Sequence, residues 1–300
     1  MINIQRALRG MSAPQTDQDR AERFNADMAK REAGNFYWGF ISLGYHERMA
    51  IYALYNFARQ VDDEADSLGG NVADLPARLA VHRERIVRAG RGDYGDDPIL
   101  RVLSEAMERY AIPESELQML VDGCEMDFTQ HSYRTFDDLK AYCNLVASVV
   151  GRMCVRIFGF TDPVALERAD DLGMALQLTN ILRDVREDAV DMKRVYLPQE
   201  DLERFGIPVE ALSSGQIYPG WNQYVQHHVA LAREYFVTGY EVLRYIPRRP
   251  AACVKTMAGI YEELLKKIER EPGLPLRERT ALSKTEKLRV VVKSWLSSSP

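Results

Sequence analysis

The composition of this 300-residue chain is that of an ordinary globular protein, with 46% hydrophobic and 28% charged residues. The formal net charge of −5 argues against non-specific nucleic-acid binding, which requires a basic surface. The four cysteines show no CxxC spacing, so they favour reduced thiols over a zinc site or a disulfide framework.

We expect a cytoplasmic protein without a membrane-spanning segment. The first twenty residues are polar and contain no apolar signal core. We find no run of about 18 uncharged apolar residues, which is the length that a membrane span needs.

Helical periodicity dominates the chain. Apolar residues recur at i, i+3, i+4 and i+7 between widely spaced prolines, and alternation with period two is nearly absent. We therefore predict an all-α protein, with a flexible segment over residues 1–18 and a single domain over residues 19–300.

The expected helices span residues 20–32, 46–67, 71–90, 97–110, 114–131, 135–159, 163–190, 218–245, 248–269 and 284–296. The segments 135–159 and 163–190 are rich in apolar and small residues on most faces. This pattern is typical of central helices.

A first acidic cluster closes the helix predicted at residues 46–67, in the string ARQVDDEADS. Asp62 and Asp66 are four residues apart, so they share one face of the helix. An apolar run precedes them, and we expect the pair to face the inside of a bundle. Taken alone, the cluster is also explained by a solvated acidic helix end.

A second acidic cluster lies in the string LTNILRDVRED. Asn180, Asp184 and Asp188 follow one another at intervals of four residues and share a helix face. Surface ion pairing between Arg183 and Glu187 is the competing explanation for this cluster.

The two clusters together predict a metal site between two helices. Carboxylates one turn apart repel each other, and a cation removes that cost. Oxygen ligands without Cys or His suit Mg²⁺, with Mn²⁺ as the alternative, bound through carboxylates, waters and substrate phosphates. The candidate ligands are Asp62, Asp66, Asn180, Asp184 and Asp188.

Basic residues near the clusters are candidates for binding a diphosphate. They are Arg59, Arg183, Lys193, Arg194 and Arg279. Prenyl diphosphates ionise when Mg²⁺ and basic side chains neutralise the leaving group.

An allylic cation formed in this way needs a dry, apolar tunnel. Ala147, Val150, Gly151 and Gly173 leave room for such a tunnel between the two central helices. Tyrosines with electron-rich faces can stabilise the cation, although each is also explained by packing. The candidates are Tyr52, Tyr55, Tyr142 and Tyr261.

Three strings resemble the squalene/phytoene synthase family, the head-to-head prenyl transferases. They are YALYNFARQVDDEAD, YCNLVASVVGRM and LGMALQLTNILRDVREDAVDMKRVYLP, and the resemblance runs from about Asn35 to about Lys287. It implies a single-domain, all-α isoprenoid-synthase bundle around a central cavity. Two aspartate-rich motifs would face each other there and bind Mg²⁺ with the diphosphates.

The resemblance also implies roles for single residues. Asp62, Asp63 and Asp66 match the first motif, and Asn180, Asp184 and Asp188 match the second. Further matches to family site positions are Arg59, Gln177, Tyr55, Tyr142, Tyr261, Phe36, Phe40 and Arg279.

From the motifs and the resemblance we assign the site residues. The expected catalytic residues are Asp62, Asp66, Asp184, Asp188, Tyr142 and Arg59. The expected substrate-binding residues are Arg59, Tyr55, Tyr142, Gln177, Asn180, Arg183, Arg194, Tyr261, Arg279 and Phe36. Ala33, Gly34 and Asn35 stand where many members carry serines, so no phosphate contact is assigned there.

The implied reaction joins two prenyl diphosphates through a cyclopropyl diphosphate. We predict the Mg²⁺-dependent 1'-1 condensation of two farnesyl diphosphates to presqualene diphosphate, with NADPH required only if the reaction continues to squalene. The run YCNLVASVVGRMCVRIFGF is similar to bacterial presqualene diphosphate synthases, whereas phytoene synthases usually have VAGTVG.

Three alternatives remain open at this point. A phytoene synthase would condense two geranylgeranyl diphosphates, and a terpene cyclase would use one substrate. A non-catalytic helical protein that binds lipid or a partner would be expected to have lost one motif, and both are complete here.

Two further expectations follow from the chemistry. Replacing Asp62 or Asp184 by Asn should abolish turnover without loss of stability, because the carboxylates repel each other when no metal is bound. The water-insoluble product implies transient contact with a membrane surface, although the sequence shows no amphipathic anchor. No oligomeric state is predicted.

Overall fold

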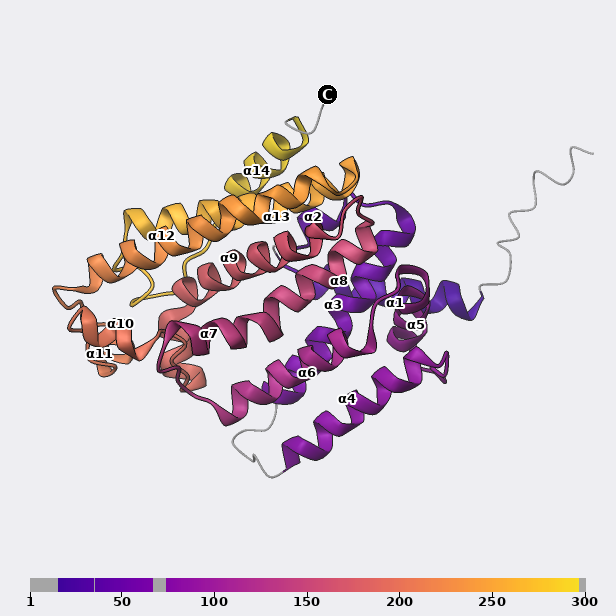
Figure 1. Ribbon diagram of the computed structural model, residues 1–300, viewed down its shortest axis with the longest axis horizontal. Coiled ribbons are helices and arrows are strands. Elements are labelled where there is room, and N and C mark those ends of the chain that lie inside the picture. Colours follow the sequence, from indigo (N-terminus) through magenta and orange to yellow (C-terminus); the bar gives the residue numbers. More distant parts are fainter. Residues whose placement is uncertain (1–15, 35, 67–73, 297–300) are drawn as a thin grey trace, which may run out of the picture.

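The computed structural model describes residues 16–34, 36–66 and 74–296 of the chain. These ranges form helices and loops without a strand, apart from an isolated bridge between Ser132 and Val195 (Figure 1). The predicted all-α fold is therefore confirmed. Most of the segment predicted to be flexible lies outside the described residues, and helix α1 already begins at Asp17.

Helices predicted from periodicity are all present in the described residues. They are α1 (Asp17–Glu32), α3 (Tyr45–Asp66), α4 (Leu75–Gly90), α5 (Pro98–Tyr110), α6 (Glu114–Thr129), α7 (Phe136–Cys143), α8 (Val149–Phe158), α9 (Val164–Glu187), α12 (Trp221–Gly239), α13 (Arg248–Arg270) and α14 (Lys284–Leu296). The π-helix η3 (Asn144–Ser148) joins α7 to α8, and together they form the helix expected at 135–159.

Short helical segments were not predicted, because they offer too few residues for a periodic pattern. They are α2 (Tyr37–Phe40), α10 (Gln199–Arg204) and α11 (Glu210–Ser214). Two other segments extend longer helices: the π-helix η4 (Asp188–Met192) follows α9, and the 3₁₀ helix η5 (Tyr240–Arg244) follows α12.

Side-chain caps fix where several helices begin. The hydroxyls of Thr16 and Thr135 accept from the N–H groups of Asp19 and Asp138, whose carboxylates accept in return from the threonine N–H groups. These reciprocal bonds satisfy donors that the first turn of a helix leaves without partners.

Helix α9 occupies the centre of the bundle, between α13 on one side and α8 on the other (Figure 1). It also packs against α12, and the predicted central position of 163–190 is confirmed. The helical segment Phe136–Phe158, with a mean hydropathy of 1.3, is long and apolar enough to cross a membrane, contrary to our expectation. It packs against α6 and α9, as a core helix does.

Glycines bring α8 and η3 into close contact with α9. A Cβ atom on Gly151 would lie 2.7 Å from the carbonyl oxygen of Ala169, and one on Gly173 would lie 2.8 Å from that of Ala147. Real Cβ atoms do not approach main-chain oxygens so closely. The backbones of the two central helices therefore touch only because both positions lack a side chain.

We predict that Gly173→Ala lowers the free energy of unfolding by about 1–3 kcal/mol, because main-chain atoms cannot move aside for the added methyl group. Gly259→Ala is the matched control, since its Cβ would meet only a methyl carbon of Val290, at 2.9 Å. Thermal unfolding measures both. Equal melting temperatures for the two variants would contradict the close contact at Gly173.

Candidate active site

An apolar cavity of about 200 Å³ lies between α3, α8, α9 and α13. The residues predicted to leave room for a tunnel, Ala147, Val150, Gly151 and Gly173, all line it. Carbon atoms dominate its wall, and its polar lining includes the side chains of Gln177 and Asn180 on α9. The cavity therefore has a polar end and a long apolar part.

Both acidic motifs continue from helix turns that line this cavity. Asp62 comes one turn after Ala58 on α3, and Asp184 comes one turn after Asn180 on α9. Figure 1 shows α3 and α9 ending on the same side of the bundle. Each motif therefore follows directly on a helix turn that lines the cavity.

Two arginines hold Asp184 of the second motif. Its Oδ1 lies 2.8 Å from Nε of Arg183 and 3.0 Å from Nε of Arg279, and Arg183 makes a second bond to Oδ2. Arg183 is buried beside the hydroxyl of Tyr261 and pairs with Asp184, so it does not pair with Glu187. Instead, Glu187 pairs with Arg279 at 3.4 Å.

Asp188 lies one turn further along, at the start of the π-helix η4. Burial raises the pKa of its carboxyl to about 8, and the charges of Asp184, Glu187 and Asp127 act in the same direction. The guanidinium of Arg183 opposes this shift only partly. Several carboxylates thus converge on a partly buried site with too little positive charge among them.

Asp127 on α6 is not among the predicted site residues. Its carboxylate is buried and accepts hydrogen bonds from the hydroxyls of Tyr142, at 3.0 Å, and Tyr196, at 2.7 Å. Tyr142, Tyr196 and Tyr133 pack ring to ring with centroids 5.3–5.9 Å apart. The sequence offered no signal for this residue, because its helix also carries Glu114, Glu116, Asp122 and Glu125 and nothing in the pattern distinguishes Asp127 from them.

The first motif is more open than the second. Arg59 reaches Asp62 at 3.1 Å and Asp63 at 2.6 Å, and the side chains of both aspartates are about half exposed. The predicted inward orientation therefore does not hold for Asp62, which lies at the rim. The side chain of Asp66 lies outside the described part of the chain.

Basic residues of the loop after η4 lie near the second motif. Arg194 stacks over the ring of Phe128 at 5.3 Å, and its N–H donates to the carbonyl of Asp188. Lys193 is exposed and adopts a left-handed φ of 55°. Both predicted basic residues therefore lie in the loop that directly follows η4, close in sequence to Asp188.

Aromatic rings surround part of the cavity. The ring of Phe36 lies 5.9 Å from that of Tyr261 and 6.5 Å from those of Phe40 and Tyr55. Phe40 also meets Tyr52 edge to face at 6.0 Å. This aromatic group joins α2, α3 and α13 at the cavity, where ring faces can stabilise a carbocation.

The donor set at the second motif fits a hard divalent cation. The Oδ1 atom of Asn180 is buried without a hydrogen-bond partner, and the raised pKa of Asp188 shows that its negative charge lacks compensation. Amide and carboxylate oxygens are the ligands that Mg²⁺ prefers. Asn180, Asp184 and Asp188 would hold such an ion on α9 and η4, with Asp62 on α3.

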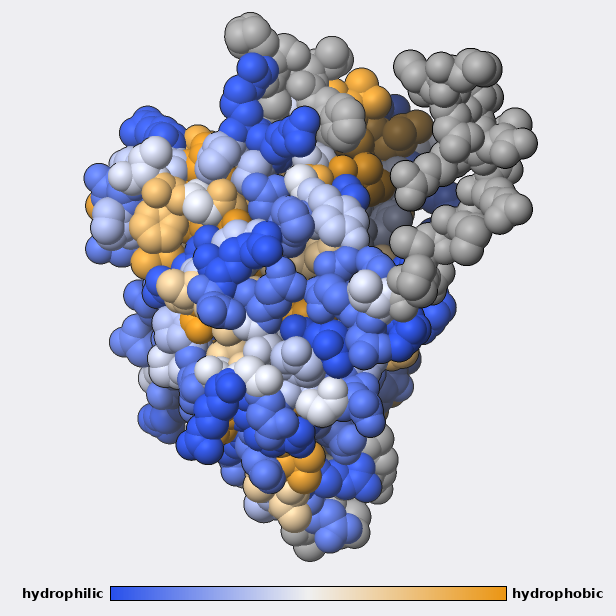
Figure 2. Space-filling view, turned by 90° about the vertical axis from the view of Figure 1, so that its right-hand side faces the viewer, coloured by the Kyte–Doolittle hydropathy of each residue, from blue (hydrophilic) through white to orange (hydrophobic). Residues whose placement is uncertain are grey.

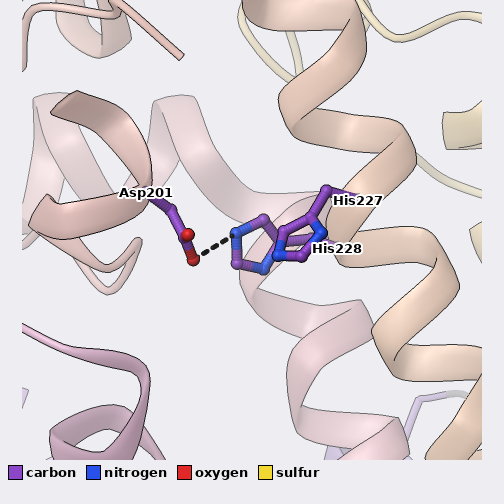
Figure 3. Close-up of side chains that lie close together, drawn as sticks. All are labelled: Asp201, His227 and His228. Carbon is purple, nitrogen blue, oxygen red and sulfur yellow. Dashed lines mark ion pairs between the residues drawn. The ribbon is translucent and has the colours of Figure 1, made fainter. Parts of the chain in front are cut away.

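A histidine–aspartate pair fixes the segment that follows the site. Figure 3 shows Asp201 of α10 directed at His228 of α12, with His227 beside it, and Nε2 of His228 lies 3.2 Å from Asp201. Adjacent residues on a helix point about 100° apart, and of these two histidines His228 is buried, which lowers the pKa of its imidazole. We interpret the cluster as a buried polar contact between a carboxylate and an imidazole, which holds α10 against α12.

Comparisons with known proteins concern the chain as a whole. The sequence pattern of the squalene/phytoene synthase family matches residues 29–286. The chain is 31% identical to the phytoene synthase of Mycobacterium tuberculosis over 288 residues, covering 94% of this chain and 93% of that protein. It is 32% identical to the presqualene diphosphate synthase of Zymomonas mobilis over 260 residues, covering 85% and 87%.

Solved structures show the same fold. A dehydrosqualene synthase in complex with a ligand superposes with a TM-score of 0.85 and 26% identity, covering 96% of this chain and 100% of that one. A squalene synthase from Alicyclobacillus acidocaldarius gives a TM-score of 0.79 and 27% identity, covering 86% and 95%.

The raised pKa of Asp188 predicts how stability depends on pH. The folded protein keeps this proton up to about pH 8, whereas the unfolded chain loses it near the ordinary value of 3.8. The free energy of unfolding of the metal-free protein should therefore contain a term that falls as pH rises between these values. Asp188→Asn removes that term.

Melting temperatures measured from pH 4 to pH 9 in chelator-treated buffer test this prediction. We expect the melting temperature of Asp188→Asn to exceed that of the wild type at pH 8 and to equal it near pH 4. A constant difference between the two proteins over this range would show that Asp188 titrates normally.

The ion pairs also change the expected stabilities of two other variants. Asp184→Asn leaves the buried guanidinium of Arg183 without its carboxylate and should cost about 3 kcal/mol of unfolding free energy. Asp62→Asn breaks an exposed pair and should cost less than about 1 kcal/mol. Chemical denaturation measures the unfolding free energy of each variant. Equal losses of unfolding free energy would contradict the different environments of the two motifs.

Proposed function

Since the chain belongs to the squalene/phytoene synthase family, and is a prenyltransferase, we propose that it condenses two farnesyl diphosphates head to head to presqualene diphosphate. One observation carries this proposal. An apolar cavity ends at carboxylates that have too little positive charge around them, flanked by arginines. This arrangement suits a substrate with a diphosphate head and a hydrocarbon tail.

The arginines at the rim bind the diphosphate oxygens. Arg59 bridges Asp62 and Asp63, Arg279 bridges Asp184 and Glu187, and both side chains remain roughly half exposed. Bound divalent cations supply the charge that stabilises a departing diphosphate. Each guanidinium keeps donors on its exposed side, so it can bind phosphate while it positions its carboxylates.

The cavity protects the carbocation that diphosphate departure leaves behind. Its lining is almost entirely carbon, so it excludes the water that would quench the cation. The rings of Phe36, Tyr55 and Tyr261 stand beside the polar end, where positive charge develops. The ordered cavity also orients the alkene of the second substrate toward the reacting carbon.

The length of the cavity supports a C15 donor. Residues from Val146 to Phe158 line it along η3 and α8, which corresponds to about 18 Å of helix. Phe158, the last residue of α8, also lines the cavity, and helix α8 carries it away from the polar end. A geranylgeranyl chain is one isoprene unit longer and would have to displace these side chains.

We propose that the reaction stops at presqualene diphosphate unless NADPH supplies a hydride for squalene. A phytoene synthase is the second candidate, favoured by the similarity to the protein of Mycobacterium tuberculosis. We further propose that the enzyme works in the cytoplasm and meets the membrane surface to deliver its apolar product.

Product analysis tests donor length and end point. We expect the purified enzyme with Mg²⁺ to convert farnesyl diphosphate to presqualene diphosphate without NADPH, and to use geranylgeranyl diphosphate at least tenfold less efficiently. Phe158→Ala should lower the preference for farnesyl over geranylgeranyl diphosphate at least tenfold, because it opens the apolar end of the cavity. Val237→Ala, at an exposed position on α12, is the matched control.

Faster turnover of geranylgeranyl diphosphate by the wild type would identify a phytoene synthase instead. No product from either donor would favour a non-catalytic role. A ratio unchanged by Phe158→Ala would show that this ring does not limit donor length.

A further inference from the structure

Helix α14 presents apolar side chains to solvent. Leu288 is 52% exposed and Val292 is 50% exposed, and four residues separate them, so they share the outer face of the helix. Val290 and Ser294 are buried on the opposite face, where Val290 meets Gly259 of α13. The inner face of α14 therefore already has its partner within the fold, and the outer apolar face has none among the described residues.

Basic residues accompany this apolar face. Lys284, Arg289 and Lys293 are exposed, and Lys287 is half-buried. The one acidic residue of the helix, Glu286, accepts hydrogen bonds from the N–H and hydroxyl of Ser283 at the helix start. A chain with a net charge of −5 thus has a helix in which cations outnumber acids four to one.

This helix lies behind the wall of the cavity. Val254 and Met257 of α13 line the cavity, whereas Gly259, about 200° further around the helix than Met257, faces α14. Figure 2 shows hydrophobic residues gathered at the top of the molecule, the end at which Figure 1 places α14. An apolar surface and the substrate cavity therefore lie on opposite sides of one helix.

We propose that the outer face of α14, formed by Leu288 and Val292 with Lys284, Arg289 and Lys293, docks on a membrane surface that carries anionic lipids. Apolar side chains flanked by lysine and arginine are the pattern of helices that lie in the plane of a membrane interface. The cations bind lipid headgroups while the leucine and valine enter the acyl boundary.

Charge decides between this occupant and a second copy of the chain. A symmetric contact between two α14 helices would bring the exposed cations of both copies together, and like charges repel when the contact excludes water. An anionic lipid surface instead supplies the opposite charge over the whole helix. The proposal concerns a surface separate from the active site and does not depend on donor length.

Vesicle binding of the full chain tests the proposal. The probes are vesicles of phosphatidylcholine alone and vesicles with equal parts of phosphatidylcholine and phosphatidylglycerol, separated from free protein by flotation. We expect binding to the anionic vesicles only. Leu288→Gln with Val292→Gln should weaken it at least tenfold, and each of Lys284→Gln, Arg289→Gln and Lys293→Gln about fivefold.

Matched controls come from other helices. Val81 on α4 and Val237 on α12 are exposed valines, 57% and 71%, outside this face, and Val81→Gln with Val237→Gln should leave binding unchanged. Turnover of detergent-dispersed substrate should stay at the wild-type level in the α14 variants. If an α14 variant lost turnover and still bound anionic vesicles like the wild type, the result would contradict the proposed docking surface.

Three results would overturn the proposal. The first is a wild-type protein that binds neither kind of vesicle or binds both equally, which would exclude an anionic lipid surface as the partner. The second is anionic-vesicle binding by the α14 variants that equals that of the wild type. Light scattering that shows a dimer in the wild type and a monomer in the Leu288/Val292 double variant, without lipid binding, would assign the face to a second copy.

Discussion

Repulsion among carboxylates at the end of an apolar cavity is the constraint on which the site depends. Burial raises the pKa of Asp188 to about 8, and the charges of Asp184 and Asp127 add to this shift. A fold does not gain stability from such a cluster by itself. The arrangement becomes favourable when cations and a diphosphate share it, so binding and catalysis explain its presence.

The surrounding fold holds this unfavourable cluster in place. Contact between the backbones at Gly151 and Gly173 fixes α8 against α9, and this contact sets the width of the cavity. Arg183 donates to Asp184 and is itself in contact with the hydroxyl of Tyr261, and the hydroxyls of Tyr142 and Tyr196 donate to Asp127. The second motif is therefore partly buried and held by ion pairs, whereas the first, with Arg59 at its rim, is more open.

Periodicity and spacing predicted the helices, the tunnel residues and the two acidic motifs, because each depends on residues close together in the sequence. The role of Asp127 depends on tyrosines brought to it from α7 and from the loop before α10, and no local pattern records such contacts. For the same reason the sequence assigned Arg183 to substrate, whereas in the fold it pairs with Asp184. The burial of His228 likewise depends on α10, a helix too short to be predicted.

A nuclear magnetic resonance titration of the Asp188 carboxyl carbon, assigned with Asp188→Asn, tests the central claim most directly. In metal-free protein the account predicts a pKa near 8. Adding Mg²⁺ with inorganic pyrophosphate should bring it below the range of the titration, because cations replace the proton. A pKa near the ordinary value of 3.8 in the metal-free protein, unchanged by these additions, would contradict it.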